Sequence, residues 1–190
     1  MRPCQSPAAA KGHFELRLSR AITQKMALPM SQLSIVPESV LDRLASGAQL
    51  ANESSAWPAE SWQAIIGAGA CQWAIPRDYG GTEMLQRDQL AGSEAIASAC
   101  LTTAFILSQR EAAVRHILRG PRHLQSRCLP ELAQGKSFVT IGLSQLTTSR
   151  QHQAPSLRAT RLSKKAFQLD GEIPWVTGAP QANYVVIGAT

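Results

Sequence analysis

The chain has 190 residues, of which 44% are hydrophobic and 17% charged, and its formal net charge is +6. This composition is that of an ordinary globular protein, and it excludes a disordered tail, a collagen-like repeat and a low-complexity scaffold. The length suits about one domain, and a chain of this size can bury a core without disulfides or metal ions.

Residues 1–30 differ from the rest because they hold five basic residues against one acidic residue and lack a clear periodicity. They also lack the long apolar run of a secretory signal. Two interpretations stay open. One is a transit-type leader, which would direct the protein to an organelle. The other, which we favour, is a start codon assigned too far upstream, with Met26 or Met30 as the true first residue. We expect a disordered segment and a cytoplasmic protein.

Apolar spacing predicts four helices in the first two thirds of the chain. Residues 34–51 carry apolar side chains at helical intervals, and a second helix follows from Pro58. Residues 85–119 are predicted to form one long helix, whose apolar middle, 95–107, is expected to pack on several sides. A shorter helix over 122–134 ends at Gly135. Between the second and third helices, residues 76–81 form a loop whose paired glycines tolerate a positive φ.

From Lys136 onward the pattern predicts strands. Residues 138–143 are predicted to form a strand, 144–156 a polar loop, and 157–162 and 166–169 two short strands, with Asp170-Gly171 as a hairpin turn signal. Residues 175–177 and 184–187 continue the β character. The predicted fold class is therefore α+β. An all-α domain over 31–135 is followed by an incomplete antiparallel β-domain over 136–190.

The four cysteines, at positions 4, 71, 100 and 128, show no metal-ligand or redox spacing, and neither do the four histidines. We therefore expect reduced, buried thiols, which favours a reducing compartment, and no metal site. The longest uncharged, largely apolar stretch, 95–107, has 13 residues. A bilayer requires roughly 20, so no membrane span is expected.

Basic side chains gather in one place in the folded part of the chain. At helical spacing they spread around the end of a helix rather than along one face, so no nucleic-acid partner is expected. The chain also lacks a nucleophile elbow and a phosphate-binding loop of the P-loop type. The basic residues are Arg115, His116, Arg119, Arg122, His123 and Arg127.

Four segments, in the same order and spacing, resemble the acyl-CoA dehydrogenase superfamily between Trp62 and Thr190. Residues 75–81 (Ile-Pro-Arg-Asp-Tyr-Gly-Gly) are similar to the family's segment ending Pro-x-Glu-Tyr-Gly-Gly, with Asp78 in place of the glutamate. Residues 120–135 resemble the family's last helix before the sheet. Residues 138–145 stand where the family has a strand ending Ala-Leu-Thr-Glu-Pro. Residues 167–178 resemble an element that contains Gly-x-Lys-x-Trp-Ile-Thr.

The resemblance implies a particular architecture and chemistry. An N-terminal helical domain packs on a middle β-domain, a C-terminal four-helix bundle follows, and FAD lies between the β-domain and the bundle. It implies an FAD-dependent oxidoreductase in which a carboxylate takes the α-proton of an acyl thioester and hydride moves from the β-carbon to the flavin. Because the bundle supplies that carboxylate in the family, no catalytic residue is predicted in this chain.

The resemblance also implies which residues contact FAD. Ser144 matches the threonine of Thr-Glu-Pro, whose hydroxyl and backbone reach the flavin's pyrimidine edge, and serine keeps that hydroxyl. Trp175 matches the aromatic residue packed on the isoalloxazine, and Thr177 a hydroxyl near its reactive nitrogen. Taken without the resemblance, the last two would be a core tryptophan and an ordinary strand residue. The predicted cofactor-binding residues are Gly142, Leu143, Ser144, Ser149, Trp175, Val176 and Thr177.

Several positions depart from the family pattern. Gln145 and Leu146 replace the Glu and Pro of Thr-Glu-Pro, and residues 149–151 (Ser-Arg-Gln) replace a Gly-Ser-Asp whose serine helps hold CoA. Arg150 is either a phosphate contact or a solvated loop charge, and His152 is either an exposed loop residue or a group near the flavin. These changes affect thioester binding more than flavin binding. A flavin-dependent monooxygenase of the same fold and a non-catalytic interaction module are therefore the alternative functions.

The resemblance extends only to the N-terminal part of the family's architecture. We therefore expect a truncated chain that is inactive alone and poorly soluble, because an unpaired apolar strand is prone to aggregate. The expected partners are an acyl thioester or another small-molecule substrate, an unidentified electron acceptor and, for a full-length form, further copies in a homo-oligomer.

Overall fold

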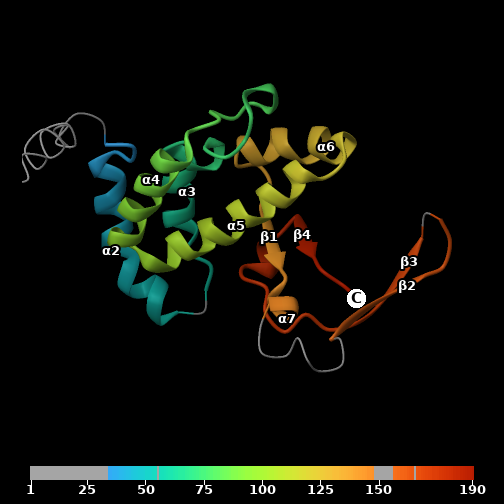
Figure 1. Ribbon diagram of the computed structural model, residues 1–190. Helices are drawn as coiled ribbons and strands as arrows, with labels where there is room; N and C mark the ends of the chain where they lie inside the picture. The colour runs from blue at the N-terminus through green and yellow to red at the C-terminus, as the bar shows by residue number, and fades with distance from the viewer. Residues whose placement is uncertain (1–33, 55, 148–155, 165) are drawn as a thin grey trace, which may run out of the picture. The chain divides into compact units, whose positions relative to one another are not determined.

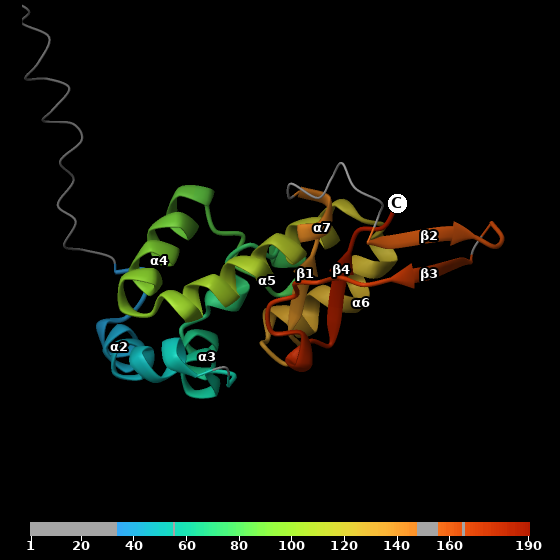
Figure 2. The ribbon, with the colours of Figure 1, turned by 90° about the horizontal axis from the view of Figure 1, so that it is seen from below.

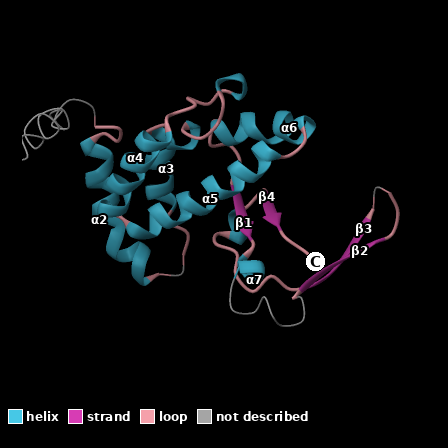
Figure 3. Cartoon of the chain, in the orientation of Figure 1, coloured by secondary structure: helices cyan, strands magenta, loops and turns pink. Residues whose placement is uncertain are grey.

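The computed structural model describes residues 34–54, 56–147, 156–164 and 166–190 (Figure 1). The predicted leader lies outside the described residues, and so do Ser149, Arg150 and His152. Residues 34–190 form one compact unit, in which the longer helices precede the strands along the chain (Figure 3). The α+β class predicted from the sequence is confirmed.

The first two predicted helices are present. Helix α2 spans Glu38–Glu53, with Pro37 at its N-cap, and α3 spans Ala59–Gly67, with Pro58 at its N-cap. Proline suits these positions because its fixed φ is compatible with the start of a helix and its missing N–H is not needed there. The two helices pack against each other through buried side chains such as Leu44 and Ile65.

The prediction of one long helix over 85–119 is wrong in one respect, because two helices occupy this range. Helix α4 spans Gln86–Ala99 and α5 spans Leu101–Arg119, with Cys100 between them at φ −152° and ψ 102°. The Cys100 N–H donates to Ile96 O at 2.8 Å and closes α4, while its carbonyl accepts from Ala104 N at 3.1 Å and opens α5. This break lets α4 and α5 pack against each other.

Two short 3-10 turns, η1 (Ala70–Gln72) and η2 (Arg77–Tyr79), connect α3 to α4, and α6 spans Arg122–Ala133. The loop predicted over 76–81 contains η2 and ends in the two glycines. Gly80 has φ +82°, and a Cβ on Gly81 would lie 1.9 Å from Ile75 O. Glycine is therefore required at both positions, at the first by conformation and at the second by close backbone contact.

Four short strands form two separate pairs. Strand β1 (Val139–Gly142) pairs in parallel with β4 (Tyr184–Ile187), and β2 (Leu157–Arg161) pairs antiparallel with β3 (Phe167–Gly171). The predicted antiparallel arrangement therefore holds for β2 and β3 only. Strands β1 and β4 run parallel because the long intervening segment returns the chain to the starting edge, as parallel pairs require.

Three local predictions in the β part need correction. Asp170 and Gly171 are not a turn, because they lie in β3 and pair with Arg158 and Leu157, while the hairpin reverses between β2 and β3. Residues 175–177 form a loop rather than a strand. Residues 144–156 are not wholly a loop, since α7 occupies Ser144–Thr147. In two views, the β2–β3 hairpin extends away from β1 and β4 (Figures 1 and 2).

The β part shares its core with the helices. Phe138, just before β1, lies edge-on to Trp57 and Trp62, with ring centroids 5.1 and 5.2 Å apart. Val139 is fully buried in a second cluster with residues of α5 and α6 such as Val114 and Leu129. Consequently β1 and the loops around it are held directly by the helical part.

A buried arginine fixes α5 in this arrangement. Arg110 is completely inaccessible and donates to Glu111 Oε1 at 2.6 Å, to Cys71 O at 2.9 Å and to Leu132 O at 2.7 Å. It therefore joins α5 to η1 and to the end of α6. Burial raises the pKa of Glu111, and the neighbouring Arg110 guanidinium opposes that shift.

The three cysteines that the structure describes agree with the prediction of buried, reduced thiols. Cys71, Cys100 and Cys128 are free and buried. Burial raises the pKa of the Cys71 thiol, which keeps it in the unreactive neutral form. Among the described residues, no helix is long and apolar enough to cross a membrane, and no group of three metal-ligating side chains occurs.

Candidate functional site

Four of the predicted cofactor-binding residues meet in one hollow. It has a volume of about 280 Å³ and lies between α5, the end of β1 and the loop at 175–177. Both Figure 1 and Figure 2 show α5 running beside β1 at this place. We call it the α5–β1 hollow. It is lined by Phe105, Gln109, Ile141, Leu143, Ser144, Trp175 and Thr177.

Two aromatic side chains in this hollow are unusually accessible. Trp175 is 71% exposed and Phe105 is 50% exposed. A large aromatic residue normally buries most of its surface, so their exposure leaves flat apolar faces available to a planar ligand. Ser144 and Thr177 belong to the same lining, and both carry a hydroxyl group, of which the Ser144 Oγ is buried.

The other predicted residues lie outside the lining. Gly142 is buried, and a Cβ there would be 2.9 Å from Val176 Cγ2 and 3.0 Å from Ile173 Cγ2. Gly142 therefore lets residues 173–176 pack closely on β1, which brings Trp175 to the hollow, and Val176 supports that contact from behind. Ser149 lies outside the described residues.

Sequence reasoning missed the α5 side of the hollow. Phe105 and Gln109 are one helical turn apart, so they share a face of α5. In the sequence, Phe105 lies within the apolar stretch 95–107, which is predicted to be core, and Gln109 lies shortly after it. Nothing local separates them from buried neighbours such as Ile106, because their exposure depends on β1 lying beside α5.

The lining fits part of a flavin. It combines aromatic faces with two hydroxyls, which are the groups that a ring with polar edges requires. Its volume is near the lower limit for small-molecule pockets, so it suits the ring system rather than a whole dinucleotide. The seven lining residues carry no ionisable side chain. They can bind and orient a ligand, but they cannot act as its proton acceptor.

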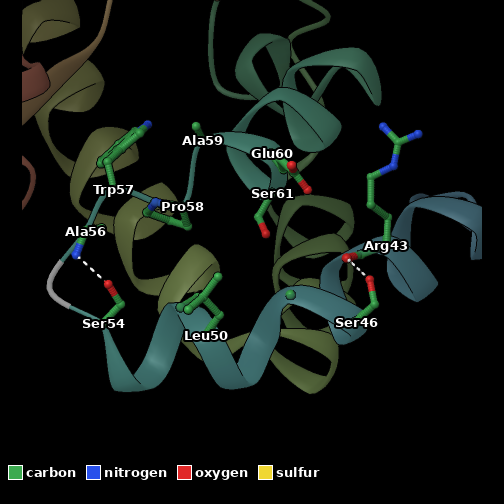
Figure 4. Close-up of a pocket in the computed structure, with 12 residues that line it drawn as sticks. Arg43, Ser46, Leu50, Ser54, Ala56, Trp57, Pro58, Ala59, Glu60 and Ser61 are labelled. Atoms are coloured by element: carbon green, nitrogen blue, oxygen red, sulfur yellow. Dashed lines mark hydrogen bonds between the residues drawn. The ribbon is translucent and has the colours of Figure 1, made fainter.

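A second hollow of about 280 Å³ adjoins the first, with Phe105 and Thr177 in both linings. It extends from α5 to residues 56–58 and shares Trp57 and Pro58 with a larger groove of about 520 Å³ between α2 and the start of α3 (Figure 4). None of the predicted cofactor-binding residues lines that larger groove. Four of the predicted flavin contacts line the α5–β1 hollow, and none lines this groove.

Comparison with protein families identifies the class of protein that this fold represents. The family described as "Acyl-CoA dehydrogenase, N-terminal domain" matches residues 35–136, which is more than half of the chain. The chain therefore belongs to the acyl-CoA dehydrogenase family. Among curated proteins, no sequence matches the chain.

Solved structures share the fold at low sequence identity. An acyl-CoA dehydrogenase complexed with FAD from Bacillus anthracis has 18% identity and a TM-score of 0.64 over 82% of this chain and 28% of that chain. The 3-HSA hydroxylase from Rhodococcus sp. RHA1 has 18% identity and a TM-score of 0.66, over 80% and 36%. A structure of the electron transferring flavoprotein of Acidaminococcus fermentans has 20% identity and a TM-score of 0.63, over 82% and 44%. The chain thus spans less than half the length of each.

Proposed function

We propose that this chain forms one side of an FAD site in an acyl-CoA dehydrogenase-like oxidoreductase that oxidises an acyl thioester at its α- and β-carbons. One observation carries the proposal. Residues 143–144 and 175–177 are far apart in the sequence, yet Leu143, Ser144, Trp175 and Thr177 line one open hollow. They are also the residues whose counterparts contact FAD in the family that the chain resembles.

Each residue has a distinct role in this proposal. Trp175, whose side chain is exposed, would pack on the isoalloxazine, and the hydroxyls of Ser144 and Thr177 would hydrogen-bond to its polar edges. Leu143 excludes water from the apolar part of the ring. FAD, when bound, accepts the hydride from the substrate. Because the lining lacks an ionisable group, the base that takes the α-proton has to come from outside this hollow.

The α5 side of the hollow is the proposed substrate side. Phe105 lines both the α5–β1 hollow and the adjoining one, so a ligand lying along α5 touches both. The adjoining hollow includes apolar residues such as Ile106 and Pro180. An apolar acyl chain is the kind of group that such a lining accommodates.

A titration of the purified chain with FAD tests the proposal. We expect saturable quenching of flavin fluorescence, and a loss of affinity of at least about tenfold in a Trp175→Ala/Thr177→Ala double variant, since stacking and a hydrogen bond are both removed. The matched control is Phe167→Ala/Thr160→Ala, which changes an exposed aromatic and a threonine on the distant hairpin. Equal affinities in the two double variants, or no binding by a folded chain, would contradict the proposal.

A flavin-dependent monooxygenase is the second candidate. The observation that favours it is the replacement of the family's Thr-Glu-Pro and Gly-Ser-Asp patterns at residues 144–146 and 149–151, which weakens the case for CoA contacts. In a form of the protein that binds FAD, reduction of the flavin by acyl-CoA would support the dehydrogenase. Oxygen consumption with reduced flavin, and no reaction with acyl-CoA, would select the monooxygenase.

A non-catalytic interaction module is the third candidate function. It is selected if the folded chain binds no flavin but co-purifies with a separate chain. Assembly into a homo-oligomer and a cytoplasmic location are further parts of the proposal, and sedimentation and fractionation test them separately from flavin binding.

A further inference from the structure

The junction between α5 and α6 carries a dense group of cations that the flavin site does not use. Figure 1 shows α5 running directly into α6. Residues 112–130 include no aspartate or glutamate. We call this surface the basic corner, and all six of its residues are exposed. They are Arg115, His116, Arg119, Arg122, His123 and Arg127.

The nearest acidic residues along the chain are already engaged. Glu111 is buried and pairs with Arg110 at 2.6 Å. Glu131 Oε2 accepts a hydrogen bond from Ser137 Oγ at 2.6 Å. Within the described part of the chain, no cation of the basic corner forms an ion pair. Arg115 interacts electrostatically with Glu111 at longer range, and the charge of the other cations is available to an external partner.

The corner is also held in a fixed shape. Gln125 Nε2 donates to Leu118 O at 3.0 Å and to Gly120 O at 2.8 Å, and Tyr79 OH donates to Gln125 Oε1 at 3.2 Å. These bonds tie the first turn of α6 to the last turn of α5 and to η2. The cations are thus mounted on a preorganised turn, which reduces the entropy lost when a partner docks.

The start of α6 adds a second reason to expect an anionic partner. Its N-cap is Pro121, which provides no side-chain hydrogen bond, and its first turn contains no acid. Arg122 and His123 occupy the first two positions of the helix, where the helix dipole disfavours positive charge. Negative groups from another molecule would offset this unfavourable arrangement.

We propose that the basic corner docks an acidic surface of a partner protein. Residues 112–137 contain no phenylalanine, tyrosine or tryptophan, whereas single-stranded nucleic acids are usually held by stacking on such residues. None of the three hollows described above includes a residue of the corner, and its six side chains are exposed, as suits docking on an open surface. Complementary charge on an open surface mainly accelerates encounter and selects the partner.

Binding of the full chain to fluorescent poly-L-glutamate, followed by anisotropy at about 50 and 200 mM salt, tests the proposal. We expect saturable binding that weakens with salt. An Arg119→Gln/Arg122→Gln variant should bind roughly tenfold more weakly at the lower salt concentration. The charge-matched control is Arg17→Gln/Arg20→Gln, which removes two cations from the other basic segment of the chain and should leave affinity within about twofold.

Three results would overturn the proposal. Equal weakening by both variants would mean that net charge alone is responsible. No binding at the lower salt concentration would mean that the basic corner does not bind acidic chains. Tighter binding of a DNA duplex than of poly-L-glutamate, lost in the Arg119→Gln/Arg122→Gln variant, would make the partner a nucleic acid. Circular dichroism verifies that each variant is folded. If Arg119→Gln/Arg122→Gln is not folded, the charge-reversing variant Arg115→Glu takes its place, after the same check.

Discussion

Arg110 is the residue on which the position of α5 most depends. Its guanidinium bridges η1, α5 and α6 through three groups within 2.9 Å, with no exposure to solvent. A buried ion pair adds little net stability when it is intact, but removing one partner leaves an uncompensated charge. The intact pair therefore adds little to the net free energy of unfolding. Its main effect is to favour the helix arrangement in which both charges are paired.

We predict that Arg110→Met lowers the free energy of unfolding at pH 8 by about 3–5 kcal/mol, as measured by urea denaturation. The exposed Arg43→Met is the control and should change it by less than about 0.5 kcal/mol. The double variant Arg110→Met/Glu111→Leu should lose clearly less unfolding free energy than Arg110→Met alone, because it leaves no unpaired carboxylate in the interior. A loss below about 1 kcal/mol for Arg110→Met would show that the buried pair is dispensable.

The raised pKa of Glu111 has a defined effect on stability. Burial makes the folded protein hold this proton to a higher pH than the unfolded chain does. Stability falls with rising pH wherever the folded state binds more protons. The contribution of Glu111 to the free energy of unfolding should therefore decline from about pH 4.5, its ordinary pKa, up through the raised value.

Glu111→Gln removes this titration, so the difference in unfolding free energy between the original chain and the variant isolates it. We expect that difference to move against the original chain between about pH 4 and pH 8. Urea denaturation at several pH values measures it. A difference that is independent of pH, or that favours the original chain increasingly as pH rises, would contradict the assignment.

At the scale of elements, periodicity predicted where helices occur but not where one ends and the next begins. The break at Cys100 contains neither glycine nor proline, and it depends on α4 and α5 packing against each other. The sequence Asp170-Gly171 predicted a hairpin turn, but the structure requires Gly171 for another reason. A Cβ on Gly171 would lie 2.0 Å from Ser156 O, so glycine permits close contact between β3 and the chain before β2 rather than a turn.

The two glycines after η2 give a test at this scale. Gly81→Ala should lower the free energy of unfolding by more than about 1 kcal/mol, because the new Cβ would meet the Ile75 backbone. Gly67→Ala, at the end of α3, has open space within 4 Å and should be neutral or stabilising by up to about 1 kcal/mol. Thermal or chemical denaturation compares the two, and equal effects would show that the close contact is not limiting.

The flavin contacts show how far sequence reasoning reached for the site. Resemblance to a family nominated Trp175 and Thr177, and the structure places both in the α5–β1 hollow. Phe105 and Gln109 escaped notice because a residue's exposure on a mostly apolar helix is decided by the strand beside it. The family's pattern consists of local segments, whereas the opposite wall of the hollow depends on tertiary packing.

Across the whole molecule, stability is expected to be uneven. Thr140 in β1 is fully buried, whereas every residue of β3 is exposed and the β2–β3 hairpin contributes little to either core cluster. A two-stranded hairpin is marginal without such packing. We predict that backbone amides of β2 and β3 exchange with deuterium well before those of β1. Beyond β3, β2 also exchanges two backbone hydrogen bonds with Thr190, at 2.9 and 3.2 Å. Similar protection in the two pairs would mean that these bonds stabilise the hairpin as strongly as the core stabilises β1.

The central claim is that the α5–β1 hollow holds flavin, and mapping bound FAD by NMR tests it most directly. On titration with FAD, we predict chemical-shift changes concentrated at the amides of residues 141–144 and 175–178 and on α5 around Phe105 and Gln109. Residues 43–61, which include the lining of the groove in Figure 4, should shift little away from Trp57. Changes centred on that groove, with residues 141–144 unaffected, would contradict the account.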